Sequence, residues 1–184
     1  MRSITDLFNL ALSHLAQGYV VNDPTEQTPH ARLCSTYYPI CRQELLDDDH
    51  QWTFAVASLP LNIDAGYLAK PAYVLPSDFI RPFQLESGER FFIEGDHLFT
   101  EDPAPILRYV RDIKDLAKLP PKFKIALSYL LAWRIAGPLA QSKEKQDKTE
   151  QQFAMAKTEA INKDLQQHRI ENRPDFEGSL IQAR

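Results

Sequence analysis

The chain has 184 residues, of which 43% are hydrophobic and 25% charged, an ordinary composition for one globular domain or a domain with an appendage. Its net charge of −4 and pI of about 5.7 argue against a protein that grips nucleic acid through a broad basic face. No apolar run approaches the roughly 20 residues that span a bilayer, and Asp6, Asn9 and His14 interrupt any signal-peptide core. The sequence therefore predicts a soluble protein that is made and kept in the cytoplasm.

Two helices are predicted at the N-terminal end of the chain. Apolar residues at helical spacing indicate a first helix from Ile4 that ends before Gly18. Thr28 before Pro29 is typical of an N-cap with proline in the first turn, and predicts the start of a second helix. Pro39 lies inside this helix and is expected to kink it. The residues expected to face inward are Leu33, Cys34, Tyr37, Cys41 and Leu45.

An acidic corner follows the second helix. Acidic residues at a helix C-terminus oppose the helix dipole, so Asp47, Asp48 and Asp49 are expected to end the helix in water. Trp52 and Phe54 then begin an alternation of apolar residues that is typical of one face of a strand. We expect these two aromatic residues to anchor the junction between the helices and a β region.

The middle of the chain is punctuated by prolines, and its apolar runs are too short for helices. Segments 72–76, 90–101 and 105–113 are predicted strands, and the second of them is a hairpin that turns at Gly95 and Asp96. These segments predict a small, largely antiparallel sheet inserted between helices.

Two further helices are predicted after this sheet. Pro120 and Pro121 open the third, which is expected to end near Gly137 and Pro138. The fourth covers residues 142–169 and carries only a narrow apolar stripe, which is typical of a helix on a surface or against a neighbouring subunit. The stripe consists of Phe153, Ala154, Ala160, Ile161 and Leu165.

The predicted fold class is α+β, mainly an α-helical bundle of two N-terminal and two C-terminal helices. A small antiparallel β module is inserted in it, and a flexible tail follows. Residues 1–169 form the single domain, with the bundle at 1–50 and 120–169 and the β insertion at about 51–119. Residues 170–184 contain too little apolar surface to fold alone and are predicted to be the tail.

Few residues suggest metal binding or nucleophilic catalysis. His30, Cys34 and Cys41 lie at helical-turn spacing, but structural zinc needs four ligands and no CxxC or HxxxH motif supplies the others. The two cysteines are separated by about 10 Å along a helix, which is too far for a mutual disulfide. A cysteine nucleophile with His14 as its base is disfavoured, because thiols on a buried apolar stripe are usually inert.

The sequence also lacks the motifs of other kinds of binding and catalytic site. The stretch from Asp47 to His50 lacks the alternating oxygen ligands, the glycine and the closing glutamate of a calcium loop. No nucleophile elbow is present, and the scattered glycines form no phosphate-binding loop. A modest basic cluster, diluted by neighbouring acids, is interpreted as a solvated face; its members are Lys114, Lys118, Lys122 and Lys124. We therefore predict no catalytic residue, no cofactor and no metal, and favour a role in assembly.

Several segments, in order along nearly the whole chain, carry a family resemblance. They are FNLALSHLAQ, the helix with YYPICRQELL, then WTFA, YVLPSDFIRP, and YVRDI…LPPKFKIALSYLLAWRIAGPLAQS before a charged helix. Together they resemble the adaptor proteins of short-tailed bacteriophages, the tail tubular protein A family, also called head-to-tail connector or gatekeeper-ring proteins. The acidic link before Trp52 and the detail of the β segment depart from the family pattern.

The resemblance implies a structural virion protein, made in the cytoplasm of the bacterial host, that forms a ring of twelve beneath the portal. Its partners would be the portal protein, the tail nozzle or tubular protein, and other copies of itself. DNA would pass through the central channel without sequence-specific binding, and no membrane would be involved. The family's C-terminal region reaches toward the portal, which implies a docking set of Ile170, Phe176, Leu180, Ile181 and Arg184.

The residues themselves are compatible with this role. A closed ring needs two different faces on each subunit, and the fourth helix could supply one of them. Net negative charge suits a channel through which DNA slides, because a basic lining would hold the phosphates. Two other classes stay open: a small cytoplasmic enzyme whose site the sequence does not reveal, and a regulatory binding module.

Overall fold

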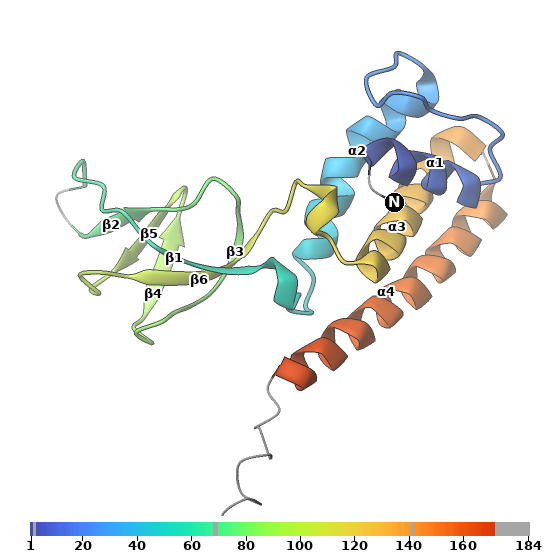
Figure 1. The fold of residues 1–184 in the computed structure, drawn as a ribbon. Coiled ribbons are helices and arrows are strands. Elements are labelled where there is room, and N and C mark those ends of the chain that lie inside the picture. The colour runs from blue at the N-terminus through green and yellow to red at the C-terminus, as the bar shows by residue number, and fades with distance from the viewer. Residues whose placement is uncertain (2, 68–69, 141, 172–184) are drawn as a thin grey trace, which may run out of the picture.

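The computed structural model describes residues 1, 3–67, 70–140 and 142–171. In this part of the chain a helical region lies beside a β region that projects from it (Figure 1). The helices are α1 (Ile4–His14), α2 (Pro29–Leu46), α3 (Pro121–Ala140) and α4 (Lys143–Glu171). The strands are β1 (Val56–Pro60), β2 (Ala72–Val74), β3 (Phe79–Leu85), β4 (Phe91–Glu94), β5 (His97–Thr100) and β6 (Ile106–Arg111). Two short 3-10 turns, η1 (Thr53–Ala55) and η2 (Leu116–Lys118), join the two regions.

The prediction of a mainly helical bundle with one small inserted module is wrong. The described strands form two separate three-stranded antiparallel sheets, in the orders β1-β6-β3 and β2-β5-β4. With about 49% helix and 19% strand, the fold is a mixed α+β arrangement. The extended run predicted from Trp52 overlaps the start of β1, which ends at Pro60, whereas β3, which contains Pro82, was not predicted. Both strands are edges of their sheet, and the register of β3 shifts beside Pro82, so neither proline interrupts a central ladder.

The N-terminal helices follow their predicted signals closely. Ser3 caps α1, with its Oγ accepting the Asp6 N–H at 3.1 Å, and the Asp6 carboxylate accepts the Ser3 N–H in return. Thr28 caps α2, its Oγ1 accepting the Ala31 N–H at 3.3 Å. Pro39 lies inside α2, which is one helix from Pro29 to Leu46. The buried stripe of α2 uses Tyr38 where the spacing predicted Tyr37.

Helix α3 is the centre of the helical region and packs against the other three helices. It continues to Ala140, past the predicted end at Gly137 and Pro138. A proline in the last turn removes one backbone hydrogen bond, which the buried face of α3 outweighs. The buried stripe of α4 contains Ala156 and Ala160, small residues in the same core as α3. Of the predicted stripe, Ala160 is buried and Phe153 and Ile161 pack against this core, whereas Ala154 and Leu165 are exposed.

The predicted strand alternation at Trp52 and Phe54 is wrong, because Thr53–Ala55 forms the 3-10 turn η1. Trp52, predicted with Phe54 to anchor the junction, is only 1% exposed and belongs to the helical core, against which the partly buried Phe54 packs. Its Nε1–H donates to the Leu45 carbonyl at 2.7 Å. Its ring lies edge-on to Phe123 of α3, with 5.0 Å between centroids.

The acidic corner is only partly in water. Asp47 and Asp49 are exposed as predicted, but Asp48 is half-buried and pairs with Lys157 of α4 at 2.8 Å. Arg81 of β3 donates its Nη2–H to the Asp48 carbonyl at 2.9 Å. Because the corner contacts both β3 and α4, it joins the two regions rather than simply ending α2.

A buried ion pair makes a second connection between the regions. The Arg42 Nε and Nη2 groups of α2 donate to the two Asp112 carboxylate oxygens at 2.7 and 2.8 Å, just beyond β6. Gln43 adds a third donor to Asp112 at 3.2 Å. Burial alone would raise the pKa of Asp112, but the bonds from Arg42 and Gln43 outweigh it and lower that pKa.

Candidate functional site

The sheet β2-β5-β4 carries apolar residues on both of its faces. Phe92 of β4 and Ala72 of β2 both pair with Phe99 of β5, so these three side chains share one face. Leu98 and Ile93, the adjacent pair in the ladder, face the small core of the β region. That core also contains Leu85, Leu107 and Tyr109. The face with Phe92 and Phe99 points away from it.

We call the surface formed by Tyr67, Phe92 and Phe99 the outer aromatic face. The rings of Phe92 and Phe99 stack with 4.9 Å between centroids and 7° between planes. Tyr67 meets the Phe99 ring edge-on at 5.6 Å. Phe99 is only 8% exposed, whereas Tyr67 and Phe92 stay 48% and 47% exposed. Exposed aromatic surface of this kind is typical of a site that a partner covers.

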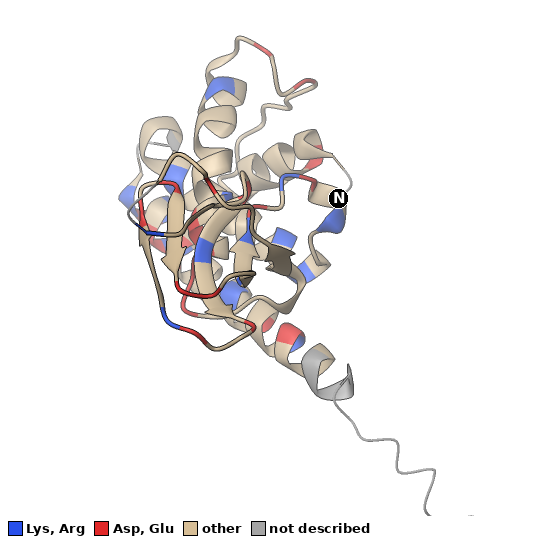
Figure 2. Cartoon of the chain, turned by 90° about the vertical axis from the view of Figure 1, so that its left-hand side faces the viewer, with Lys and Arg blue, Asp and Glu red and all other residues tan. Residues whose placement is uncertain are grey.

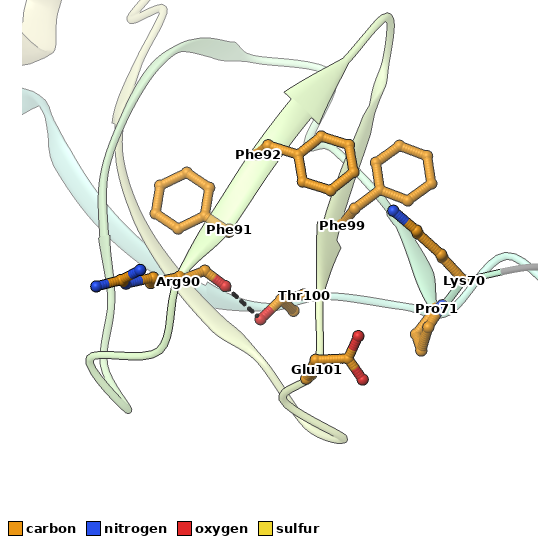
Figure 3. Close-up of a pocket in the computed structure, with 8 residues that line it drawn as sticks. All are labelled: Lys70, Pro71, Arg90, Phe91, Phe92, Phe99, Thr100 and Glu101. Atoms are coloured by element: carbon orange, nitrogen blue, oxygen red, sulfur yellow. Dashed lines mark hydrogen bonds between the residues drawn. The ribbon is translucent and has the colours of Figure 1, made fainter.

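A pocket of about 230 Å³ opens beside these rings (Figure 3). The Lys70 side chain extends toward the Phe92–Phe99 pair, with its Nζ 5.4 Å from the Phe92 centroid, in cation–π geometry. The Thr100 hydroxyl donates to the Arg90 carbonyl at 3.0 Å and so is already engaged. The residues that line the pocket are Lys70, Pro71, Arg90, Phe91, Phe92, Phe99, Thr100 and Glu101. Apolar rings with charged groups at the margin can bind a partner, but they supply no paired acid and base.

His97 fixes the loop that carries Tyr67. Its Nε2 lies 2.9 Å from an Asp64 carboxylate oxygen, and its Nδ1 lies 2.7 Å from Asp96. The Tyr67 ring packs on the imidazole with 4.7 Å between centroids. The pKa of Asp64 is lowered, first by the N–H of Gly66 and then by the bond to His97. The loop is therefore held in place on the outer aromatic face by polar contacts.

A second pocket, of about 130 Å³, lies where α4 meets the segment that enters the β region. We call it the junction pocket. The Asp164 carboxylate of α4 accepts hydrogen bonds from the Thr53 N–H at 3.2 Å and from the Thr53 hydroxyl at 2.6 Å. The same carboxylate lies 3.0 Å from His50 Nε2. Its lining residues are Trp52, Phe54, Pro120, Pro121, Lys122, Phe123, Ala160, Lys163, Asp164 and Gln167.

One serine–histidine contact exists in the helical core, and sequence analysis missed it because its residues are far apart in the chain. His14 Nε2 lies 3.1 Å from Ser128 Oγ, but the Ser128 hydroxyl donates to the Ile125 carbonyl at 2.7 Å. The imidazole is therefore a donor to the serine and cannot take its proton. Ser128 is also 0% exposed, and burial lowers the pKa of His14. This pair is a packing contact.

The cysteines lie on the buried stripe, as predicted. Cys34 and Cys41 are both free, and burial raises the pKa of each thiol to about 12, which makes both poor nucleophiles. His30 stacks on Tyr19 with 4.5 Å between centroids. Among the described residues no group of three or more His, Cys, Asp or Glu side chains could hold a metal ion.

The remaining sequence candidates have separate outcomes. In the basic cluster, Lys122 pairs with Glu159 at 2.7 Å, and basic and acidic residues are interspersed over the face in Figure 2. Ile170 lies in the last turn of α4, beyond the predicted helix end. The other predicted docking residues, Phe176, Leu180, Ile181 and Arg184, lie outside the described residues.

Comparison of the sequence with protein-family models and with curated proteins finds no match to either. None of the helices in the described part of the chain combines the length and the apolar content that crossing a bilayer requires. The functional argument therefore depends on the residues and their geometry.

Proposed function

We propose that the protein is a head-to-tail adaptor of a short-tailed bacteriophage. In this role it is a non-enzymatic virion protein that forms a ring of twelve between the portal and the tail tube or nozzle. The ring surrounds part of the channel through which DNA leaves the head. The observation that carries the proposal is the outer aromatic face on a β region that projects from the helical region (Figure 1).

A ring subunit needs two different surfaces, one for each neighbour. The outer aromatic face suits one of them, because Tyr67 and Phe92 are large, half-exposed and held by stacking. The helical region exposes aliphatic side chains, among them Val20, Ile40, Met155 and Leu165, and the buried side of α4 is taken by α3. The stacked rings of the β region are the exposed aromatic surface that this proposal assigns to contact with another chain.

The segments that carry the family resemblance support the proposal by their location. FNLALSHLAQ forms most of α1, and YYPICRQELL forms the end of α2. WTFA contains η1 and Trp52, and YVLPSDFIRP extends from β2 into β3. These segments make the helical core and its connection to the β region, which are the parts that fix the subunit's shape.

The charge distribution also suits the role. The chain is acidic overall, with a net charge of −4, and basic residues on the β side are interspersed with acidic ones (Figure 2). A channel lined by such surfaces exerts little electrostatic hold on DNA phosphates. In this proposal the docking set of Ile170, Phe176, Leu180, Ile181 and Arg184 binds a cleft between portal subunits.

Native mass measurement of the purified protein, alone and mixed with the portal ring of the same phage, tests the proposal. The expected result is a complex with twelve copies bound to the portal. A chain that ends at Glu171 should keep its fold, because the described core is complete without later residues, and should fail to assemble. A protein that never binds portal rings, with or without these residues, contradicts the proposal.

A further inference from the structure

The junction pocket lies close to the point where the described chain ends. Gln167 lines the pocket and is one helical turn before Glu171, the last residue of α4. One turn is about 6 Å along a helix axis, so the next part of the chain starts near the pocket. Trp52 and Phe123, which meet edge-to-face and are each only 1% exposed, line the pocket together with the partly buried Phe54 and with Ala160 of α4.

The pocket has the size and character of a site for one aromatic ring. Its volume is about 130 Å³, and an apolar cavity of about 150 Å³ is enough to hold a benzene molecule. Lys163 stands among the lining residues as an exposed cation, whereas Lys122 already pairs with Glu159 at 2.7 Å. The Asp164 carboxylate already accepts hydrogen bonds from Thr53 and interacts with His50, so it is engaged with this chain's own groups.

The sequence after α4 contains a residue that fits this description. Phe176 stands between Asp175 and Glu177, so an aromatic ring is flanked by two carboxylates. From Glu171 to Phe176 an extended chain reaches roughly 17 Å, which is enough to turn back along the end of α4. The acidic flanks complement the exposed Lys163 at the pocket.

We propose that the junction pocket binds the phenyl ring of Phe176 from the same chain. A short linker gives an effective concentration in the millimolar range, so an intrinsically weak contact is largely occupied within one subunit. A consequence, which rests on the proposed adaptor function, is that the pocket holds the docking segment against its own subunit. Portal binding must then compete with the pocket, which limits premature association of free subunits.

Tryptophan fluorescence tests the contact without any portal. The chain has two tryptophans, and Trp133→Phe leaves Trp52, which lines the pocket, as the only one. In that background Phe176→Ala should change the emission wavelength of Trp52, because the polarity of the pocket that it lines changes. Leu180→Ala, a matched apolar truncation in the same segment, should leave the emission unchanged. Equal emission spectra for the parent and Phe176→Ala proteins overturn the proposal.

A peptide of residues 172–184 provides the second measurement. Added to the full-length Trp133→Phe, Phe176→Ala protein, it should restore the parent signal with saturation, and the Phe176→Ala peptide should not. Lys163→Glu should weaken peptide binding several-fold, while Lys148→Glu, an exposed lysine of the same helix, should not. If the Trp52 emission of the parent protein changes to that of the Phe176→Ala protein on dilution, the Phe176 ring comes from a second copy. This result overturns binding within one chain. Because no portal is present, the result is independent of whether the adaptor proposal holds.

Discussion

The helical region and the β region bury their apolar residues to different extents. The core of the helical region includes residues from all four helices and extends to Trp52 and Val110. The core cluster of the β region contains four buried residues among those described, Leu85, Leu98, Leu107 and Tyr109, and Phe92 and Tyr67 stay half-exposed. The outer sheet of the β region therefore has an aromatic face that a partner can cover.

The difference matters because the two regions are firmly joined. The Arg42–Asp112 pair and the bond from Arg81 of β3 to the Asp48 carbonyl both lie between them. A partner bound to the β region would therefore transmit its position to the helical region. An adaptor that fixes one ring with respect to another needs such a connection.

The largest expected effect is at the junction. Trp52→Ala should cost about 3–5 kcal/mol of unfolding free energy, because it removes a fully buried indole and its bond to Leu45. Denaturant unfolding followed by circular dichroism gives this value. Trp133→Ala is the control, since Trp133 is only partly buried and should cost less. An unchanged midpoint for Trp52→Ala would show that the junction is not anchored there.

Matched leucine truncations compare the two cores directly. Leu130→Ala in α3 should lower the free energy of unfolding by an amount near the upper end of the range of about 2–5 kcal/mol, because close-packed neighbours hold open the cavity that the truncation leaves. Leu98→Ala in β5 should lower the free energy of unfolding by an amount near the lower end of this range, because the smaller core of the β region can collapse around the gap. Urea unfolding of both variants measures the difference. A larger loss for Leu98→Ala would contradict the contrast between the regions.

The pH dependence of stability reports on the buried connection. The folded pKa of Asp112 is lowered, so its carboxylate stabilises the fold above the unfolded value of about 3.9. This contribution is lost as the pH falls through the folded pKa. Asp112→Asn should cost about 1.5–3 kcal/mol at neutral pH, and its stability should fall less than that of the parent below about pH 4. Parallel stability curves for the two proteins would show that this ion pair does not couple to folding.

The helices and the strands β2, β4, β5 and β6 were largely predictable from the sequence, but the pairing of the strands into two sheets was not. The starts of α1 and α2 are set by local sequence, because Ser3 and Thr28 cap their helices through hydrogen bonds to nearby backbone groups. The strand β3 depends on pairing with β6, farther along the chain, and Pro82 concealed it. Pro82 is tolerated only because β3 is an edge strand. The edge position of a strand cannot be inferred from its local sequence.

The candidate surfaces were harder to predict than the fold. Tyr67, Phe92 and Phe99 come from three segments, and only the register of β4 on β5 puts Phe92 and Phe99 on one face. The alternation in segment 90–101 predicted a hairpin but could not say which of its faces would stay uncovered. Asp164 gave no sequence signal, since its role depends on contact with Thr53, which is distant in the chain.

The smallest expected effect on stability is on the outer aromatic face. Phe92→Ser should cost only about 0.5–1.5 kcal/mol, mainly from the lost stack with Phe99, yet should sharply reduce ring assembly. Phe83→Ser is the control, because Phe83 is a similarly exposed phenylalanine that lies against Arg108 on the other sheet. Sedimentation of both variants with portal rings measures assembly. Equal assembly of Phe92→Ser and the parent would remove the outer aromatic face from the interface.

Hydroxyl-radical footprinting of the protein, free and assembled on portal rings, tests most directly whether the β region is completed by a partner. Oxidation of Tyr67 and Phe92, which are 48% and 47% exposed in the free subunit, should fall several-fold on assembly, while oxidation of Phe83 stays the same. Unchanged oxidation of Tyr67 and Phe92 in a complex that has formed would contradict the account.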